Sequence, residues 1–324
     1  MVTLNARELK AKAKTCLETS RNNTRSLVLI YTVTLVVLSL VANGLNVYLN
    51  NQISGTGGLA GLGTRSILQT VQQVVTYFYS FFTPFWQAGF LYTVIRNART
   101  EQTEYSSLFF GFRRILRILS HSLALIAVTF LLALAACNLA SNLFLLTPFA
   151  DPLTELLLPL MEQGTILSAD GMLDLTAIPM DALIKACTPL LILCLVIFIP
   201  AYIFVNYCFR MSLYLLVQGP EIGGIGSLVA SWKLMRGHKL ELLKLDLSYW
   251  WYYALGILIT AVCYLDTILP LLGITLPINA TAAYFVTLIL YGLLTIALYV
   301  WKKWEVDTAY VLAYEAITYK KREL

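Results

Sequence analysis

The chain has 324 residues, of which 58% are hydrophobic and 13% are charged, and its formal net charge is +5. Soluble domains carry about 25% charged residues, so this composition excludes an ordinary water-soluble domain. The chain must contact an apolar solvent, and the sequence therefore predicts an integral membrane protein.

Six stretches are long and apolar enough to cross a bilayer, since a spanning helix needs about 20 apolar residues. A backbone in lipid must satisfy its own hydrogen bonds, and the runs lack the period-two alternation of a barrel strand. We therefore expect an all-α membrane protein with six transmembrane helices. These spans are predicted at residues 26–48, 66–95, 118–146, 189–217, 247–269 and 281–301.

The basic residues lie almost entirely on one side of the predicted spans. All but two of the 23 lysines and arginines flank that side, and the exceptions are Arg65 and Lys185. Cytoplasmic segments are enriched in lysine and arginine, so both ends of the chain are predicted to be cytoplasmic. We expect this charge to meet the anionic headgroups of membrane lipids and not nucleic acid, because no nucleic-acid recognition motif accompanies it.

A short amphipathic segment precedes each pair of spans, at residues 5–18, 105–116 and 226–235. The second and third segments share the pattern Ser-Leu-x-x-small-aromatic-basic, at 107–113 and 227–233. An aromatic ring beside a cation suits a helix that lies in the headgroup layer. We therefore expect three hairpins, each introduced by an interfacial amphipathic helix on the cytoplasmic side.

The shared pattern recurs 120 positions along the chain, which suggests an internal repeat. The chain is expected to form a single polytopic membrane domain over residues 1–324, with pseudo-repeats at 1–100, 101–220 and 221–324. The first copy matches the other two weakly, and a coincidental match between the second and third copies is the alternative.

The third and fourth spans are joined by an acidic segment at residues 147–188. Asp151 and Pro152 form a good helix start, and Gly164 is a plausible stop. The leucines between them predict a helix on the outer surface. It is too short and too acidic to be a seventh span.

The second span carries a stripe of polar residues spaced alternately by four and three positions, so that all lie on one helical face. Lipid cannot satisfy side-chain amides, so this face is expected to point into the bundle or into a wet cavity. Two interpretations stay open, namely hydrogen bonds between helices and the wall of a polar path. The stripe consists of Gln69, Gln73, Thr76, Ser80, Thr83 and Gln87.

Arg210 lies in the fourth span, where an arginine is costly unless its side chain extends to the headgroups or is paired. The candidate partners are Glu305 and Asp307, near one end of the sixth span. One interpretation is that Arg210 extends to lipid phosphate. The sharper hypothesis is an ion pair between Arg210 and Asp307 that ties the fourth and sixth spans together.

The most distinctive sequence lies between the fourth and fifth spans. Ser-Trp-x-Leu-Met-x-Gly at 231–237 predicts a helix that stops at the glycine. A basic stretch and Leu-Asp-Leu-Ser at 245–248 then lead into an aromatic run at 249–253. The candidate cytoplasmic interface motif consists of Ser231, Trp232, Arg236, Gly237, His238 and Asp246.

These residues, with Thr-Ala-Tyr at 308–310 and Ala-Tyr-Glu at 313–315, resemble a known family. It comprises the bacterial, mainly Firmicute, integral membrane proteins catalogued as domain of unknown function nine-seven-five. The chain departs from the family pattern at 305–307, where a Pro-Tyr pair is usual. The resemblance implies several spans in a bacterial cytoplasmic membrane, and it implies no activity.

The sequence contains no metalloprotease, nucleophile-elbow, Walker or dinucleotide motif, and its two histidines are His121 and His238. We therefore expect a non-catalytic protein without a cofactor that binds lipids or a partner membrane protein, for example as an accessory subunit. Two alternatives stay open. One is a transporter or channel for a small or amphipathic solute that uses the polar stripe, and the other is a membrane enzyme acting on lipids.

Overall fold

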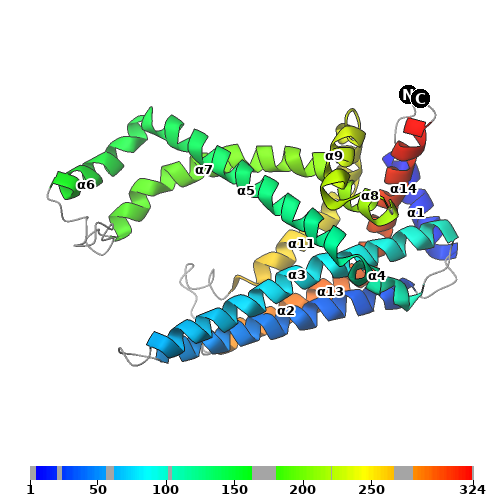
Figure 1. Ribbon diagram of the computed structural model, residues 1–324, viewed down its shortest axis with the longest axis horizontal. Coiled ribbons are helices and arrows are strands. Elements are labelled where there is room, and N and C mark those ends of the chain that lie inside the picture. The colour runs from blue at the N-terminus through cyan, green and yellow to red at the C-terminus, as the bar shows by residue number, and fades with distance from the viewer. Residues whose placement is uncertain are drawn as a thin grey trace. The chain divides into compact units, whose positions relative to one another are not determined.

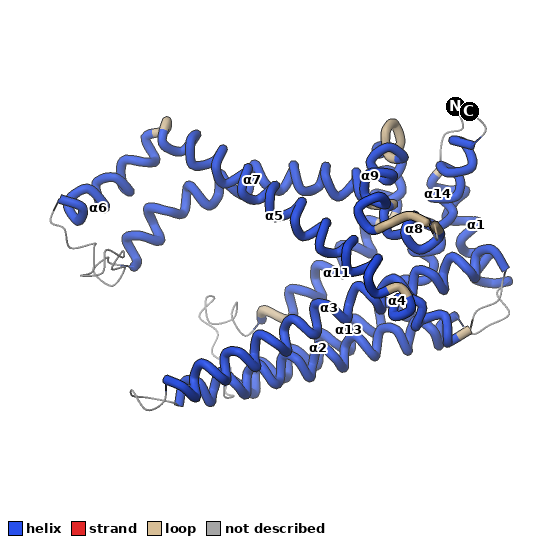
Figure 2. Tube along the Cα trace, viewed as in Figure 1, coloured by secondary structure: helices blue, strands red, loops and turns tan. Residues whose placement is uncertain are grey.

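The described residues of the computed structural model are mostly helical, with short turns between the helices, and no strand occurs among them (Figures 1 and 2). The chain forms two compact units, Met1–Ser122 with Met211–Leu324, and Leu123–Arg210. The structure describes residues 5–19, 24–55, 62–100, 104–162, 180–219, 221–265 and 280–322.

The first unit is built around three long helices that lie side by side, α2 (Thr24–Gly55), α3 (Leu62–Thr100) and α13 (Ala280–Leu298) (Figure 1). The shorter helix α11 (Trp250–Val262) packs against α13. A π-helical turn, η5 (Tyr299–Lys303), connects α13 to α14 (Trp304–Arg322). The sixth predicted span therefore continues as a helix to Arg322.

Three short amphipathic segments pack against neighbouring helices, as their apolar faces require. Helix α1 packs against α14, η2 and α4 pack against α3, and α9 packs against α8. The pseudo-repeats were predicted from sequence and stay a prediction. The bounds are α1 (Ala6–Thr19), η2 (Tyr105–Phe109), α4 (Phe110–Arg113), α8 (Ser212–Gln218) and α9 (Gly224–Leu234), followed by α10 (Lys239–Ser248).

The second unit contains most of α5 (Ile115–Leu145), η3 (Pro148–Ala150), α6 (Asp151–Glu162) and α7 (Met180–Phe209). Helix α6 begins at Asp151, where the sequence predicts it, and it packs against α7. The predicted stop at residue 164 lies outside the described residues.

Four described helices are long and apolar enough to cross a membrane, at Thr24–Ile53, Ile115–Leu145, Asp181–Gln218 and Ala282–Thr318. Helix α3 has 39 residues, but its polar stripe lowers its hydropathy. Helix α11 has 13 residues. The count of six spans, the three hairpins and the cytoplasmic position of both ends therefore stay predictions.

The core of the first unit is aromatic where α2, α3 and α14 meet. The rings of Tyr31 and Phe90 stack with centroids 4.2 Å apart, and Trp304 meets Phe90 edge-on at 5.8 Å. Trp86 packs beside them and donates a hydrogen bond from its indole Nε1 to the carbonyl of Tyr31 at 3.1 Å. This bond satisfies the one polar atom that the indole brings into the core.

Helix α3 and the short helices after it touch through their backbones at two glycines. A Cβ atom on Gly89 would lie 1.7 Å from the carbonyl oxygen of Leu108, and one on Gly111 would lie 1.9 Å from that of Phe85. Only glycine permits this separation, because it has no Cβ atom. The two glycines therefore fix how η2 and α4 lie on α3.

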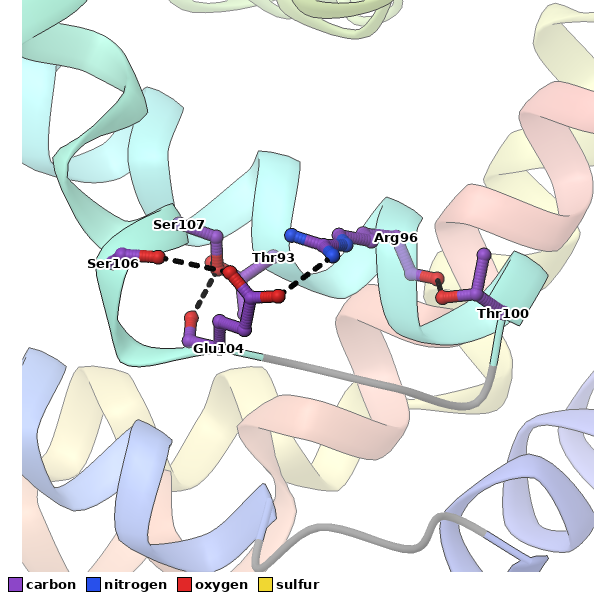
Figure 3. Close-up of polar contacts among 6 residues, drawn as sticks. All are labelled: Thr93, Arg96, Thr100, Glu104, Ser106 and Ser107. Atoms are coloured by element: carbon purple, nitrogen blue, oxygen red, sulfur yellow. Dashed lines mark hydrogen bonds and ion pairs between the residues drawn. The ribbon is translucent and has the colours of Figure 1, made fainter.

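Polar contacts across the turn hold the same junction together (Figure 3). The carboxylate of Glu104 accepts hydrogen bonds from Arg96 at 3.0 Å and Ser106 at 3.1 Å, and these bonds lower the pKa of Glu104. The Ser107 hydroxyl donates to the carbonyl of Glu104 at 2.5 Å, and the hydroxyls of Ser107 and Thr93 are 2.8 Å apart. The serine of the shared sequence pattern is thus a buried link to α3.

Replacing Gly89 by alanine is expected to destabilise the protein, because the added methyl group would collide with rigid backbone. We expect a loss of at least about 3 kcal/mol in the free energy of unfolding, measured by thermal denaturation in detergent. Gly256→Ala is the matched control, since a Cβ atom there would meet nothing within 4 Å. Equal unfolding temperatures for the two variants would show that α3 and η2 do not touch in this way.

Candidate functional site

The candidate interface motif forms the turn between α9 and α10. Gly237 has a φ of +88°, which favours glycine, and it follows the end of α9 as the sequence predicts. Met235 closes the helix by donating its N–H to the carbonyl of Ser231 at 2.8 Å. His238 pairs with Glu241 at 2.8 Å, and Lys239 lies 5.6 Å from the centroid of the Trp232 ring. Within the motif, Arg236 is exposed and Ser231 is fully buried.

Asp246, the last residue of the motif, joins three helices. Its carboxylate accepts hydrogen bonds from the hydroxyls of Tyr310 on α14 and Tyr253 on α11, the latter at 3.3 Å. The two tyrosine hydroxyls lie 2.6 Å from each other. The Leu-Asp-Leu-Ser motif at 245–248 and the Thr-Ala-Tyr motif at 308–310 therefore meet in one hydrogen-bonded cluster, although Asp246 and Tyr310 are 64 positions apart.

Lys10 connects α1 to the carboxyl end of α10, a contact that the sequence did not reveal. Its ammonium donates to the carbonyl of Ser248, near the end of α10, and lies 4.1 Å from the centroid of the Tyr249 ring. A cation at a helix carboxyl end is favoured because the last carbonyls lack helical partners. Burial lowers the pKa of Lys10, and the nearby carboxylate of Glu305 opposes that shift.

The two carboxylates proposed as partners of Arg210 have lysine partners on their own helix. Lys303 lies 3.0 Å from Asp307, and Lys302 lies 2.6 Å from Glu305. The guanidinium of Arg210 lies 5.6 Å from the centroid of the Tyr207 ring. The ion pair between Arg210 and Asp307 stays a prediction. Lys302 and Lys303 were not predicted from the sequence as partners of these carboxylates.

Aromatic rings surround the ammonium of Lys303. The ring centroids of Tyr31, Phe90 and Tyr299 lie 5.7, 5.3 and 5.0 Å from its Nζ atom. Each ring face attracts a cation, so the enclosure supplements the ion pair with Asp307. Lys303 is also the last residue of the π-helical turn η5, and such turns are frequent at functional sites.

The polar stripe of α3 is exposed along most of its length. Only Thr83 is half-buried, and the three glutamines Gln69, Gln73 and Gln87 are all exposed. The hydroxyls of Thr76, Ser80 and Thr83 each donate to a carbonyl one turn earlier in α3, at 2.8–3.0 Å. These hydroxyls are therefore satisfied within the helix, whereas the glutamine amides face outward.

A separate cavity of about 160 Å³ lies between α2, α3 and α13. Its lining combines aliphatic side chains with the hydroxyl groups of six residues. Tyr79 is the only residue of α3 in this lining, so the cavity does not follow the polar stripe. The hydroxyl-bearing residues are Thr32, Ser39, Tyr79, Tyr291, Thr295 and Tyr299.

His121 lies between two buried serines in an arrangement that resembles a nucleophile and its base. Its Nδ1 atom is 3.1 Å from Ser227 Oγ, and its Nε2 atom is 3.5 Å from Ser212 Oγ. The Ser227 hydroxyl donates to the carbonyl of Gly224 at 2.6 Å, so Nδ1 must donate to Ser227. A nucleophilic serine needs the opposite direction of donation, so Ser227 is not placed as a nucleophile that His121 activates. Among the described residues no group of three His, Cys, Asp or Glu side chains could hold a metal ion.

These features define a protein whose described residues are mostly helical, with four candidate membrane spans and with short helices packed against α3, α8 and α14. The family model described as Protein of unknown function (DUF975) matches residues 1–321. The chain therefore belongs to this family, which confirms the resemblance seen in the sequence. No curated protein and no solved structure matches the chain.

The ion pair between Lys303 and Asp307 can be tested by removing one or both charges. Lys303→Met leaves a partly buried carboxylate without its partner, and we expect the free energy of unfolding to fall by roughly 3 kcal/mol. Asp307→Leu should cost a similar amount, and the double variant should recover most of the loss. Denaturant unfolding in detergent measures all three variants.

Lys14→Met is the control, because its partner Glu18 is exposed and 3.9 Å away, and such pairs contribute about 0–1 kcal/mol. Strictly additive losses in the double variant would contradict the pair. Rescue of Arg210→Met by Asp307→Leu, without rescue of Lys303→Met, would establish the ion pair predicted from sequence instead.

Proposed function

We propose that this protein is a non-catalytic membrane protein that binds a transmembrane helix of a partner protein through the polar stripe of α3. The single observation that supports the proposal is the outward orientation of Gln69, Gln73 and Gln87. A side-chain amide has two N–H donors and a carbonyl acceptor. Lipid offers partners for none of them, so a partner helix with amide or hydroxyl side chains would satisfy them.

The proposal places the protein in a bacterial cytoplasmic membrane, with six spans and both ends in the cytoplasm. The one-sided distribution of lysine and arginine supports this orientation. In it, the short amphipathic helices α1 and α9 lie at the cytoplasmic surface, where their basic residues contact anionic headgroups. Helices α3 and α11 supply the second and fifth of these spans, in addition to the four candidate spans.

Transport or conduction of a small or amphipathic solute is the second candidate. It is favoured by the same glutamines, because exposed amides are also suited to the wall of a water-filled path. The two candidates differ in what covers the stripe. A partner helix excludes water from Gln73, whereas a conduit admits it.

A photo-crosslinking residue at position 80, within the stripe, tests partner binding in native membranes. We expect a product that joins the chain to a second polypeptide, identified by mass spectrometry. Phe78, an α3 residue that is 61% exposed and lies off the stripe, is the control position and should crosslink to lipid alone. Adding Gln73→Leu and Gln87→Leu removes two amide contacts of about 0.6 kcal/mol each, so the yield should fall roughly five- to tenfold.

Three results would contradict the proposal. A crosslink within the same chain would show that the protein covers its own stripe. Crosslinking to lipid alone at both positions would show that no partner is present. Rapid labelling of Gln73→Cys by a membrane-impermeant thiol reagent would support the transport candidate instead.

A further inference from the structure

The cavity between α2, α3 and α13 has a size and a chemistry that point to a particular ligand. Its volume of about 160 Å³ has room for several water molecules or a small polar group. A polar group of that size resembles a glycerol unit. The helices α2 and α13 both lie in candidate membrane spans, so a ligand there would have apolar surroundings on either side.

The hydroxyls in the lining offer both donors and acceptors. Thr32 donates its hydrogen to the carbonyl of Val28 at 2.8 Å, which leaves the oxygen of its hydroxyl to accept a bond. Ser39 Oγ accepts from the amide of Asn43 at 3.2 Å, which leaves its hydrogen to donate. A ligand hydroxyl is itself both donor and acceptor, so it matches this pair better than a carbonyl or an ammonium does.

The charge near the cavity favours a neutral ligand. Tyr299 lines the cavity, and its ring centroid lies 5.0 Å from the ammonium of Lys303. That ammonium is already paired with Asp307 at 3.0 Å. A phosphate or carboxylate entering the cavity would lose its hydration without gaining an unpaired cation. A neutral hydroxylated group avoids this cost.

We propose that this cavity binds the neutral, hydroxyl-bearing headgroup of an amphiphile, with the glycerol end of a diacylglycerol as the representative chemistry. The Ser39 hydroxyl donates to the ligand and the Thr32 oxygen accepts from it. Acyl chains extend from the cavity among the aliphatic side chains of α2 and α13. This site is separate from the polar stripe of α3, so the proposal does not depend on the proposed partner binding.

The test uses the full-length protein in phosphatidylcholine vesicles that contain a trace of diazirine-bearing diacylglycerol. Illumination should label the protein, and peptide mapping should place the label on α2 or α13. Unlabelled diacylglycerol should compete, and phosphatidic acid should compete at least fivefold less well. Glycerol that displaced the label at millimolar concentration would identify a free polyol, not a lipid headgroup, as the source of the same chemistry.

Ser39→Leu should fill the cavity and reduce labelling at least fivefold. Thr34→Leu on the same helix is the matched control, since Thr34 donates to the carbonyl of Ile30 and does not line the cavity. Ser39→Ala removes the donor without adding volume and should weaken labelling roughly fivefold, the equivalent of one hydrogen bond. If the Ser39→Leu variant does not fold, the labelling of Ser39→Ala tests the proposal by itself.

Unchanged labelling in folded Ser39→Leu and Ser39→Ala would overturn the proposal. Preferential competition by phosphatidic acid would overturn it as well, because the site would then recognise an anion.

Discussion

The structure depends on one constraint, namely that polar groups carried into apolar surroundings must find partners within the protein. Helix formation meets this requirement for the backbone. The hydroxyls of Thr76, Ser80 and Thr83 meet it by donating to carbonyls of their own helix. Lys303 meets it with a carboxylate one turn along α14 and with aromatic rings from α2 and α3.

The glutamines of α3 are exceptions to that pattern. The hydroxyls around the cavity follow it in part, because Thr32 donates to the carbonyl of Val28 and Ser39 accepts from Asn43, and each keeps one further hydrogen-bonding capacity. Gln73 is exposed, and lipid offers its amide no hydrogen-bond partner. The two proposals follow from these two groups of side chains. One group faces outward from α3 and suits a protein partner, and the other faces inward and suits a small neutral headgroup.

The fold could be predicted from the sequence wherever a local signal decides it. The apolar runs predicted the long helices, Asp151 and Pro152 predicted the start of α6, and Gly237 predicted the end of α9. Residues 105–116 were predicted as one segment, but they contain η2, α4 and the first residues of α5. Gly89 lies directly against the backbone of Leu108 in this segment, and no pattern in the sequence reveals such a contact.

The candidate site was predictable only in part, because most of it is non-local. The spacing of Lys303 and Asp307 by four residues is a local signal for an ion pair on one helix face. Arg210, as the arginine inside a predicted span, was instead the predicted partner of Asp307. The meeting of Asp246 with Tyr310 brings together residues 64 positions apart, and neither residue indicates the other. The same holds for Lys10 and Ser248, which only the packing of α1 brings together.

The π-helical turn at Tyr299–Lys303 has a consequence for the whole carboxyl end of the chain. A π-turn accommodates one more residue than an α-helical turn, and one residue corresponds to about 100° of helical rotation. Shortening this stretch by a single residue would therefore turn α14 about its axis. Tyr310 and Tyr314 would then move away from their neighbours on α10, α11 and α8. The five residues of the π-helical turn therefore determine which face of α14 packs against the rest of the first unit.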